Sequence, residues 1–242
     1  MGAFHSWLAD AARVREHRDL TRFTRVPPEP TIDFAGNDYL DLSRDPRVVE
    51  AAVEATRRHG AGARASRVVT GTLPVHVALE DALCHLTGQD SAVVFSSGYT
   101  ANLGVLGALS SPDALIVLDE HIHASAIDAA RASRSPVARF AHQDLASLDR
   151  VLVERTAKRA IVVVESVYSV LGDATNLVAL ADVCRARDAL LVVDEAHGVG
   201  VLGEGRGGVH AAGLAGDEDV VVTVTLSKAL GAMGGAVLGP RP

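Results

Sequence analysis

The sequence has few cysteines and no long apolar run, and each of these shortages excludes a class of protein. The two cysteines, Cys84 and Cys184, fall in separate predicted helices, so we expect neither a disulfide framework nor a cysteine metal site. The apolar runs are far shorter than the ~20 residues that span a bilayer, so we expect no membrane segment. The first residues lack the apolar core of a signal peptide, which predicts a cytoplasmic protein.

The charge is mildly acidic, and this argues against polyanionic partners. A formal net charge of −7 gives no electrostatic reason to expect nucleic acid or an anionic membrane as a partner. Any anionic ligand must therefore be held by local positive groups. Hydrophobic residues make up 48% of the chain while aromatics make up only 4%, so the apolar content is mainly alanine, valine and leucine. This composition suits helices that cover a parallel sheet.

Seven strand-like runs recur along the chain, with helical stretches between most of them. The runs lie at 92–95, 115–118, 137–140, 160–164, 190–193, 220–224 and 236–238, and the helical stretches near 100–109, 125–132, 145–157 and 177–187. Alternation at this spacing predicts right-handed parallel crossovers. The link from Lys228 to Ala236 is too short for a crossover, so the last strand should be antiparallel. The prediction is an α/β fold with a mostly parallel, seven-stranded sheet sandwiched by helices.

The first part of the chain lacks the alternation of strands and helices. Residues 6–22 predict an amphipathic helix capped by Ser6, with arginines on its polar face. Prolines then open an extended lead-in, which continues as a short extended segment at 32–42. Helices at 46–59 and 76–86 follow, joined by a glycine-rich loop. We therefore divide the chain into an N-terminal helix and arm, 1–45, and a large domain, 46–242.

The stretch that organises the chain lies near its end, at Val220–Gly235. A strand rich in β-branched residues leads into two hydroxyls, then Lys228, then a glycine tract. Open α/β sheets place their chemistry at the carboxyl ends of the strands. A lysine flanked by apolar residues loses solvation, so its pKa falls and a neutral amine becomes available for a Schiff base. The alternative is an exposed lysine whose stem covers apolar surface.

Other strand ends carry polar residues as well. The first strand runs into Ser96–Asn102 at the start of a helix, which is either an anion pocket or an ordinary serine cap. The fifth ends at Asp194, three residues before His197. An aspartate there could pair with the protonated ring nitrogen of a cofactor, or it could cap the next turn. The fourth strand leads to Glu165, Ser166 and Ser169.

Two further patterns offer alternative sites, one for a metal ion and one for a dinucleotide. His121 and His123 could begin a zinc site, but no clean set of further ligands follows, so no metal is expected. Gly198, Gly200 and Gly203 spell the dinucleotide fingerprint, which needs a helix to open at the glycines. The residues E-G-R-G-G that follow predict that no helix starts there.

Five motifs in order, N-D-Y-L, S-S-G-Y-T-A-N, H-A-S, D-E-A-H-G-V-G-V and T-L-S-K-A-L-G, resemble those of the α-oxoamine synthases. The resemblance covers the chain from about residue 6 to its last residue. It implies the aspartate-aminotransferase fold, pyridoxal 5'-phosphate (PLP) as cofactor, and a homodimer. S-R-V-V-T-G followed by His76 is most similar to the branch of biotin biosynthesis that condenses L-alanine with pimeloyl-CoA or a pimeloyl carrier protein. Another branch, such as glycine C-acetyltransferase, is the alternative.

The resemblance implies roles for the polar residues at the strand ends. Lys228 would carry the cofactor and later act as general base on the amino acid's α-proton. Asp194 would keep the pyridine nitrogen protonated. His197 and Ser169 would contact the ring oxygen, and His123 would stack on the ring face.

The resemblance also implies a phosphate site and a substrate contact. The backbone of Gly98 and Tyr99 and the hydroxyl of Thr225 would hold the phosphate, together with Ser227 or residues of a second subunit. Arg22 resembles an arginine near the acyl substrate.

The chain departs from the family pattern in two ways. Asp41, Ala65 and Leu171 replace a glycine, a glycine and an aspartate, respectively. The family continues beyond the position of Pro242 into a C-terminal small domain that carries an arginine for the amino acid's carboxylate. We therefore expect either a fragment or a PLP-binding protein without activity.

Overall fold

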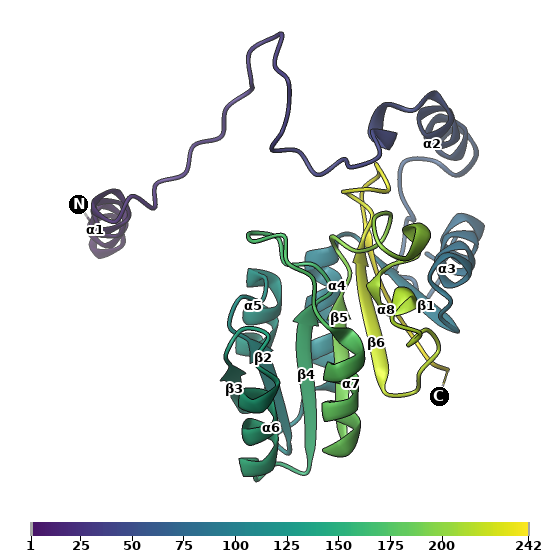
Figure 1. Cartoon of the computed structure of the whole chain (residues 1–242). Coiled ribbons are helices and arrows are strands. Elements are labelled where there is room, and N and C mark those ends of the chain that lie inside the picture. The colour runs from purple at the N-terminus through teal and green to yellow at the C-terminus, as the bar shows by residue number, and fades with distance from the viewer. Residues whose placement is uncertain (1, 242) are drawn as a thin grey trace. The chain divides into compact units, whose positions relative to one another are not determined.

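The computed structural model describes residues 2–241, which divide into an N-terminal unit that ends at Gly36 and a main unit that begins at Asn37 (Figure 1). Helix α1, Ala3–His17, is the helix of the first unit. It starts before the predicted Ser6 cap and ends five residues before the predicted limit. The chain leaves the helix because Asp19 adopts a positive φ of 52°, and the N–H of Leu20 bonds back to the carbonyl of Arg15 at 2.8 Å.

The main unit is built on one seven-stranded sheet. Its strands, in chain order, are β1 Ser91–Phe95, β2 Ala114–Asp119, β3 Val137–Phe140, β4 Arg159–Glu165, β5 Ala189–Asp194, β6 Val220–Thr225 and β7 Gly235–Gly239. The spatial order is β1-β7-β6-β5-β4-β2-β3. Strands β2 to β6 pair in parallel, whereas β7 runs antiparallel to both of its neighbours. The predicted fold class, including the antiparallel last strand, is confirmed.

Helices cover both faces of this sheet (Figure 1). Side chains of α3 Pro74–Thr87, α6 Leu145–Glu154, α7 Leu177–Ala186 and α8 Gly208–Ala211 share one core with alternate strand residues such as Val117. Side chains of α4 Gly98–Leu109 and α5 Ala124–Ala132 form a second core with the intervening residues such as Ile116. Val117 and Ile116 are both fully buried, because helices cover the two faces of β2. Among residues 2–241, no helix has both the length and the apolar content to cross a membrane.

The segment before α2, Pro46–His59, is a turn and not the extended piece that the sequence predicts. The carboxylate of Asp38 accepts the N–H groups of Leu42 and Ser43 at 3.0 and 3.1 Å, which starts a 3-10 helix at Leu42–Arg44. Asp41 adopts φ 52°, a left-handed conformation that glycine adopts without strain, and this accounts for the family's glycine there.

This turn also sits against the loop that follows β6. A Cβ built on Gly231 would lie 2.4 Å from the backbone nitrogen of Ser43, so only glycine permits the approach. The contact brings the residues just before α2 next to the loop that contains Lys228.

Candidate active site

The carboxyl ends of β4, β5 and β6 surround a cavity of about 230 Å³. All predicted site residues line it except Ser169 and Arg22. The lining consists of Ser97, Gly98, Tyr99, Asn102, His123, Ser125, Glu165, Asp194, Ala196, His197, Thr225, Ser227 and Lys228. The parallel order of the sheet thus gathers residues that are up to 131 positions apart in the sequence, since Ser97 and Lys228 meet there.

Lys228 points its amine at an imidazole. Its Nζ lies 2.7 Å from Nε2 of His197, and Nδ1 of the same ring lies 2.6 Å from the hydroxyl of Tyr39. Burial lowers the pKa of Lys228, although the charges of Asp194 and Glu165 oppose this. Burial, the charge of Lys228 and that of His123 lower the pKa of His197 to about 4. His197 is therefore neutral at pH 7, and the lysine is easier to deprotonate than one in water.

Asp194 is held rigidly at the end of β5. Its Oδ2 accepts a hydrogen bond from Nδ2 of Asn102 at 2.7 Å, and its Oδ1 accepts the N–H of Ala196 at 3.0 Å. Asn102 is itself fixed, because its Oδ1 accepts the hydroxyl of Thr223 at 2.8 Å. The carboxylate is only 6% exposed, and none of the described residues forms an ion pair with it. It is available to a protonated ligand nitrogen.

Glu165 stands beside Asp194 in the register of β4 with β5. Its Oε1 accepts the backbone N–H of His123 at 2.8 Å. Burial and the neighbouring charge of Asp194 raise the pKa of Glu165 to about 7. The floor of the cavity thus holds two carboxyl groups, and Glu165 keeps its proton up to about pH 7.

His123 caps α5 from the cavity wall. Its Nδ1 lies 2.8 Å from Oγ of Ser125, and this Oγ accepts a hydrogen bond from Nδ2 of Asn102 at 2.9 Å. Nδ1 of His123 also accepts the backbone N–H of Ser125 at 3.2 Å, so this nitrogen carries no proton in the neutral ring. His123 therefore carries its ring proton on Nε2.

An anion cradle lies at the start of α4. The first-turn N–H groups of Gly98 and Tyr99 have no acceptor within the helix, and the helix dipole is positive there. The hydroxyl oxygens of Thr225 and Ser227, at the end of β6, lie 2.8 Å apart. A Cβ on Gly98 would lie 3.0 Å from Cβ of Thr225, so the glycine keeps the two elements close. Backbone and hydroxyl donors together suit a phosphate.

The remaining predicted residues fall elsewhere. The exposed Ser169 does not line the cavity. Arg22 belongs to the N-terminal unit, and its role stays a prediction. His121 stacks on His142 with ring centroids 4.0 Å apart, away from His123. Among residues 2–241, no group of three or more potential ligands is placed to hold a metal ion.

The glycine-rich loop after β5 serves packing. A Cβ on Gly198 would lie 1.8 Å from Oε2 of Glu195, so the glycine is required by this buried carboxylate. The expectation that no helix starts after these glycines was wrong, since a 3-10 helix occupies Gly203–Gly205 and α8 begins at Gly208. The cause is Glu195, which accepts the first N–H groups of α8.

Sequence reasoning assigned no role to Asn102, Ser125 or Tyr39. Asn102 closes the motif S-S-G-Y-T-A-N, and Tyr39 belongs to N-D-Y-L, so both lay inside motifs that the resemblance used. Their partners are remote in sequence, 92 positions from Asn102 to Asp194 and 158 from Tyr39 to His197. Only the folded sheet shows these pairings.

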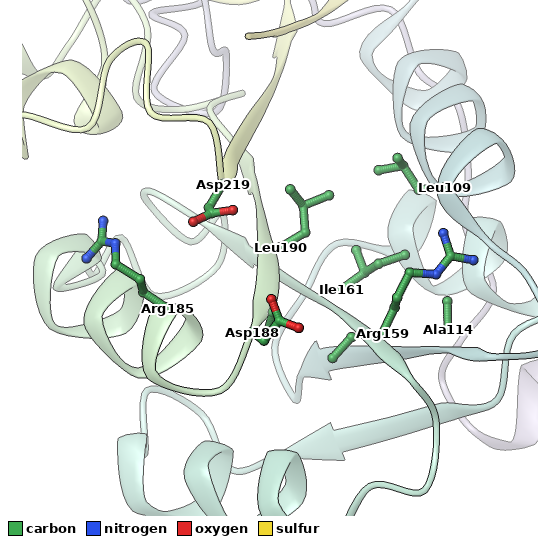
Figure 2. Close-up of a pocket in the computed structure, with 10 residues that line it drawn as sticks. Leu109, Ala114, Arg159, Ile161, Arg185, Asp188, Leu190 and Asp219 are labelled. Atoms are coloured by element: carbon green, nitrogen blue, oxygen red, sulfur yellow. The ribbon is translucent and has the colours of Figure 1, made fainter. Parts of the chain in front are cut away.

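A second hollow, also of about 230 Å³, lies at the opposite edge of the sheet (Figure 2). Two arginines, Arg159 and Arg185, and two aspartates, Asp188 and Asp219, line it together with apolar residues. Arg185 already pairs with Asp217 at 2.8 Å. The charges are balanced and no nucleophile or buried acid faces the hollow, so the chemistry belongs at the carboxyl edge.

The sheet carries a half-buried lysine after β6 and an aspartate at the end of β5. Comparison with known proteins identifies the class of protein that has this arrangement. The family model for aminotransferase class I and II matches residues 29–242. The chain therefore belongs to the aminotransferase class I and II family.

Curated relatives of high identity carry one name. Proteins named 8-amino-7-oxononanoate synthase are 52% identical over 238 residues in Mycolicibacterium gilvum and 50% identical over 237 residues in Mycobacterium ulcerans. The alignments cover 97% of this chain but 63% and 61% of those proteins. The chain thus spans less than two thirds of the length of the curated relatives it matches.

Solved structures agree with the fold. Serine palmitoyltransferase of S. paucimobilis, solved with a PLP–myriocin adduct, superposes with a TM-score of 0.87 at 30% identity over 100% of this chain and 65% of its own. 8-Amino-7-oxononanoate synthase of Francisella tularensis superposes with a TM-score of 0.75 at 30% identity over 87% of this chain and 59% of its own.

Proposed function

We propose that the chain is the PLP-binding part of an acyltransferase that makes 8-amino-7-oxononanoate. The observation that carries the proposal is the shared cavity of Lys228 and Asp194, with the anion cradle of α4 at its rim. An amine, an anionic carboxylate and a phosphate site are the three contacts that PLP requires of a protein. The proposed reaction follows from the name of the curated relatives, 8-amino-7-oxononanoate synthase.

The donor set fits PLP. The N–H groups of Gly98 and Tyr99 and the hydroxyls of Thr225 and Ser227 would hold the phosphate, and Asp194 would hold the protonated ring nitrogen. When bound, PLP supplies an aldehyde that condenses with an amine and a ring that accepts the electron pair of a carbanion. The predicted large domain, residues 46–242, would be the cofactor-binding domain.

The chain's own groups would then handle the proton and the orientation of the ring. Nζ of Lys228, with its lowered pKa, would bind the aldehyde and later take the α-proton of the amino acid. Nε2 of His197 would donate to the ring oxygen, and the imidazole of His123 would lie against the ring face. Asp194, fixed by Asn102, would keep its carboxylate in line with the ring nitrogen.

The proposed reaction joins L-alanine to a pimeloyl thioester, carried by CoA or by a carrier protein. The α-carbon of alanine displaces the thiol from the acyl carbonyl, the carboxylate leaves as CO₂, and a proton replaces it. Loss of CO₂ makes the reaction effectively irreversible. Arg22 would contact the acyl substrate. The reactants are water-soluble metabolites, which favours the predicted cytoplasmic location.

Release of CO₂ from carboxyl-labelled L-alanine tests this function. We expect release that requires both PLP and pimeloyl-CoA and that falls when glycine replaces alanine. Asp194→Asn should lower the rate by about a hundredfold or more, because a preorganised charge is lost. Release that favours labelled glycine would contradict alanine as the substrate, and CoA release from acetyl-CoA and glycine without loss of CO₂ would point to a glycine C-acetyltransferase. Absence of release from a sample that binds PLP would contradict the proposed activity and leave only cofactor binding.

We also propose that the protein is a homodimer that forms at the carboxyl edge of the sheet. The loop after β4 exposes Val170 (91%) and Leu171 (62%), and the loop after β6 exposes Met233 (88%). Exposed apolar side chains gathered on the loops of one edge are typical of a surface that is covered in an assembly. A second subunit there could also complete the phosphate site.

A further inference from the structure

Tyr39, His197 and Lys228 form a continuous chain of hydrogen bonds. The tyrosine hydroxyl lies 2.6 Å from Nδ1 of His197, and Nε2 on the other side of the ring lies 2.7 Å from Nζ of Lys228. We propose that Tyr39 is a positioning residue whose hydroxyl fixes the tautomer of His197 and thereby favours the neutral form of the Lys228 amine. Its value for cofactor capture rests on the proposed function.

The chemistry of the two groups favours one donor in the first bond. A phenol O–H is more acidic than the N–H of a neutral imidazole and is the stronger donor, while the unprotonated imidazole nitrogen is the stronger acceptor. We therefore infer that the hydroxyl of Tyr39 donates to Nδ1 of His197, 2.6 Å away. A neutral imidazole has a single N–H, so the ring proton must then reside on Nε2.

The only other partner of the hydroxyl among residues 2–241 does not oppose this. As placed, the hydroxyl of Tyr39 donates to Oδ1 of Asn37 at 3.1 Å, and the Asn37 amide is exposed to solvent. Oxygen and nitrogen of an amide are assigned from their surroundings, so Asn37 can present its N–H₂ to the hydroxyl oxygen. The tyrosine proton is then left for His197.

A proton on Nε2 of His197 changes the preferred protonation state of the Lys228 amine. An N–H aimed at Nζ from 2.7 Å is stabilised by the lone pair of a neutral amine and is repelled by an ammonium group. The opposite tautomer would offer a lone pair to the ammonium group and favour the charged form. Tyr39 thus selects the form of Lys228 that can attack an aldehyde, and it leaves His197 as a donor toward a ligand in the cavity.

Three other ionisable groups face Lys228 and His197 and influence their protonation. Asp194 and Glu165 face Lys228 from the ends of β5 and β4 and favour its charged form. His123, from the start of α5, faces His197 and disfavours protonation of the ring. All three remain in place when only the tyrosine hydroxyl is removed, so a change in the titration of Lys228 reports the hydrogen-bond chain.

The test is NMR of the chain without cofactor, comparing wild type with Tyr39→Phe. ¹⁵N-labelled histidine shows which nitrogen of His197 carries the proton, with His197→Asn to assign the signals. ¹³Cε-labelled lysine follows the ionisation of Lys228, and Lys158, the chain's other lysine, is an exposed internal reference. The control is Tyr99→Phe. Tyr99 lines the same cavity, but the hydroxyl that this change removes bonds to Asp128 at 2.9 Å.

We expect the His197 proton to leave Nε2 in Tyr39→Phe and the pKa of Lys228 to rise by about one unit, a tenfold loss of neutral amine at a given pH below it. Tyr99→Phe should change neither signal. A lysine titration that is unchanged in Tyr39→Phe, equally changed in Tyr99→Phe, or changed with the proton still on Nε2 would overturn the proposal. Since no cofactor is present, the result stands apart from any failure of Lys228 to capture PLP.

Discussion

Glu195→Ala is expected to lower the free energy of unfolding by about 4 kcal/mol, because it leaves three buried donors without an acceptor. The carboxylate of Glu195 is 1% exposed. Its Oε2 accepts the hydroxyl of Ser166 at 2.7 Å and the N–H of Gly208 at 3.0 Å, and its Oε1 accepts the N–H of Val209 at 2.6 Å. The loop from β5 to α8, which contains His197, is organised around this side chain.

Urea unfolding measures the loss, with Glu218→Ala as the matched control. Glu218 is exposed, so its replacement should change stability by no more than about 0.5 kcal/mol. Glu195→Gln keeps the shape but turns one acceptor into a donor, and we expect it to lose about 2 kcal/mol. Equal stabilities for Glu195→Ala and Glu218→Ala would show that the loop does not depend on the buried carboxylate.

The stability of the cofactor-free chain should depend on pH through two opposing groups in the cavity. The pKa of Glu165 is about 7 in the folded chain against an ordinary 4.5. Between these values the folded state keeps a proton that the unfolded chain releases, so stability falls by about 3 kcal/mol as pH rises. The pKa of His197 is about 4 against an ordinary 6.5. Here the unfolded chain binds the extra proton, so stability rises by about 3 kcal/mol as pH increases from 4 to 6.5.

Single replacements should separate the two contributions. Relative to wild type, Glu165→Gln should gain about 3 kcal/mol of stability between pH 4.5 and 7, since it lacks the group that is penalised at high pH. Relative to wild type, His197→Asn should lose about 3 kcal/mol between pH 4 and 6.5. Unfolding of the three proteins across this pH range is the measurement. Parallel profiles for all three would contradict the assigned burial of both groups.

The sheet and the strand-end residues could be predicted because they follow from local pattern. Strands covered on both faces are apolar along most of their length, so runs such as Val220–Thr225 stand out. The polar residues Asp194 and Lys228 mark where such runs end. Parallel pairing then places these ends at one edge without further information.

What escaped prediction depends on long-range contacts or on single dihedral angles. The hydrogen bonds of Asn102 to Asp194 and of Tyr39 to His197 need the folded sheet. The end of α1 was misplaced because composition stays helical through residue 22, while the positive φ of Asp19 stops the helix. The 3-10 turn after Asp38 arises from a side chain that bonds to backbone N–H groups, which a hydrophobic pattern does not reveal.

Borohydride trapping of PLP tests the central claim, that one cavity at the sheet edge offers Lys228 to the cofactor. The chain has only two lysines, Lys158 and Lys228, so Lys158→Ala is a natural control. We expect one equivalent of PLP to be reduced onto the Lys228 peptide in wild type and in Lys158→Ala, and none in Lys228→Ala. Label that persists in Lys228→Ala, or that resides on the Lys158 peptide, would contradict the account.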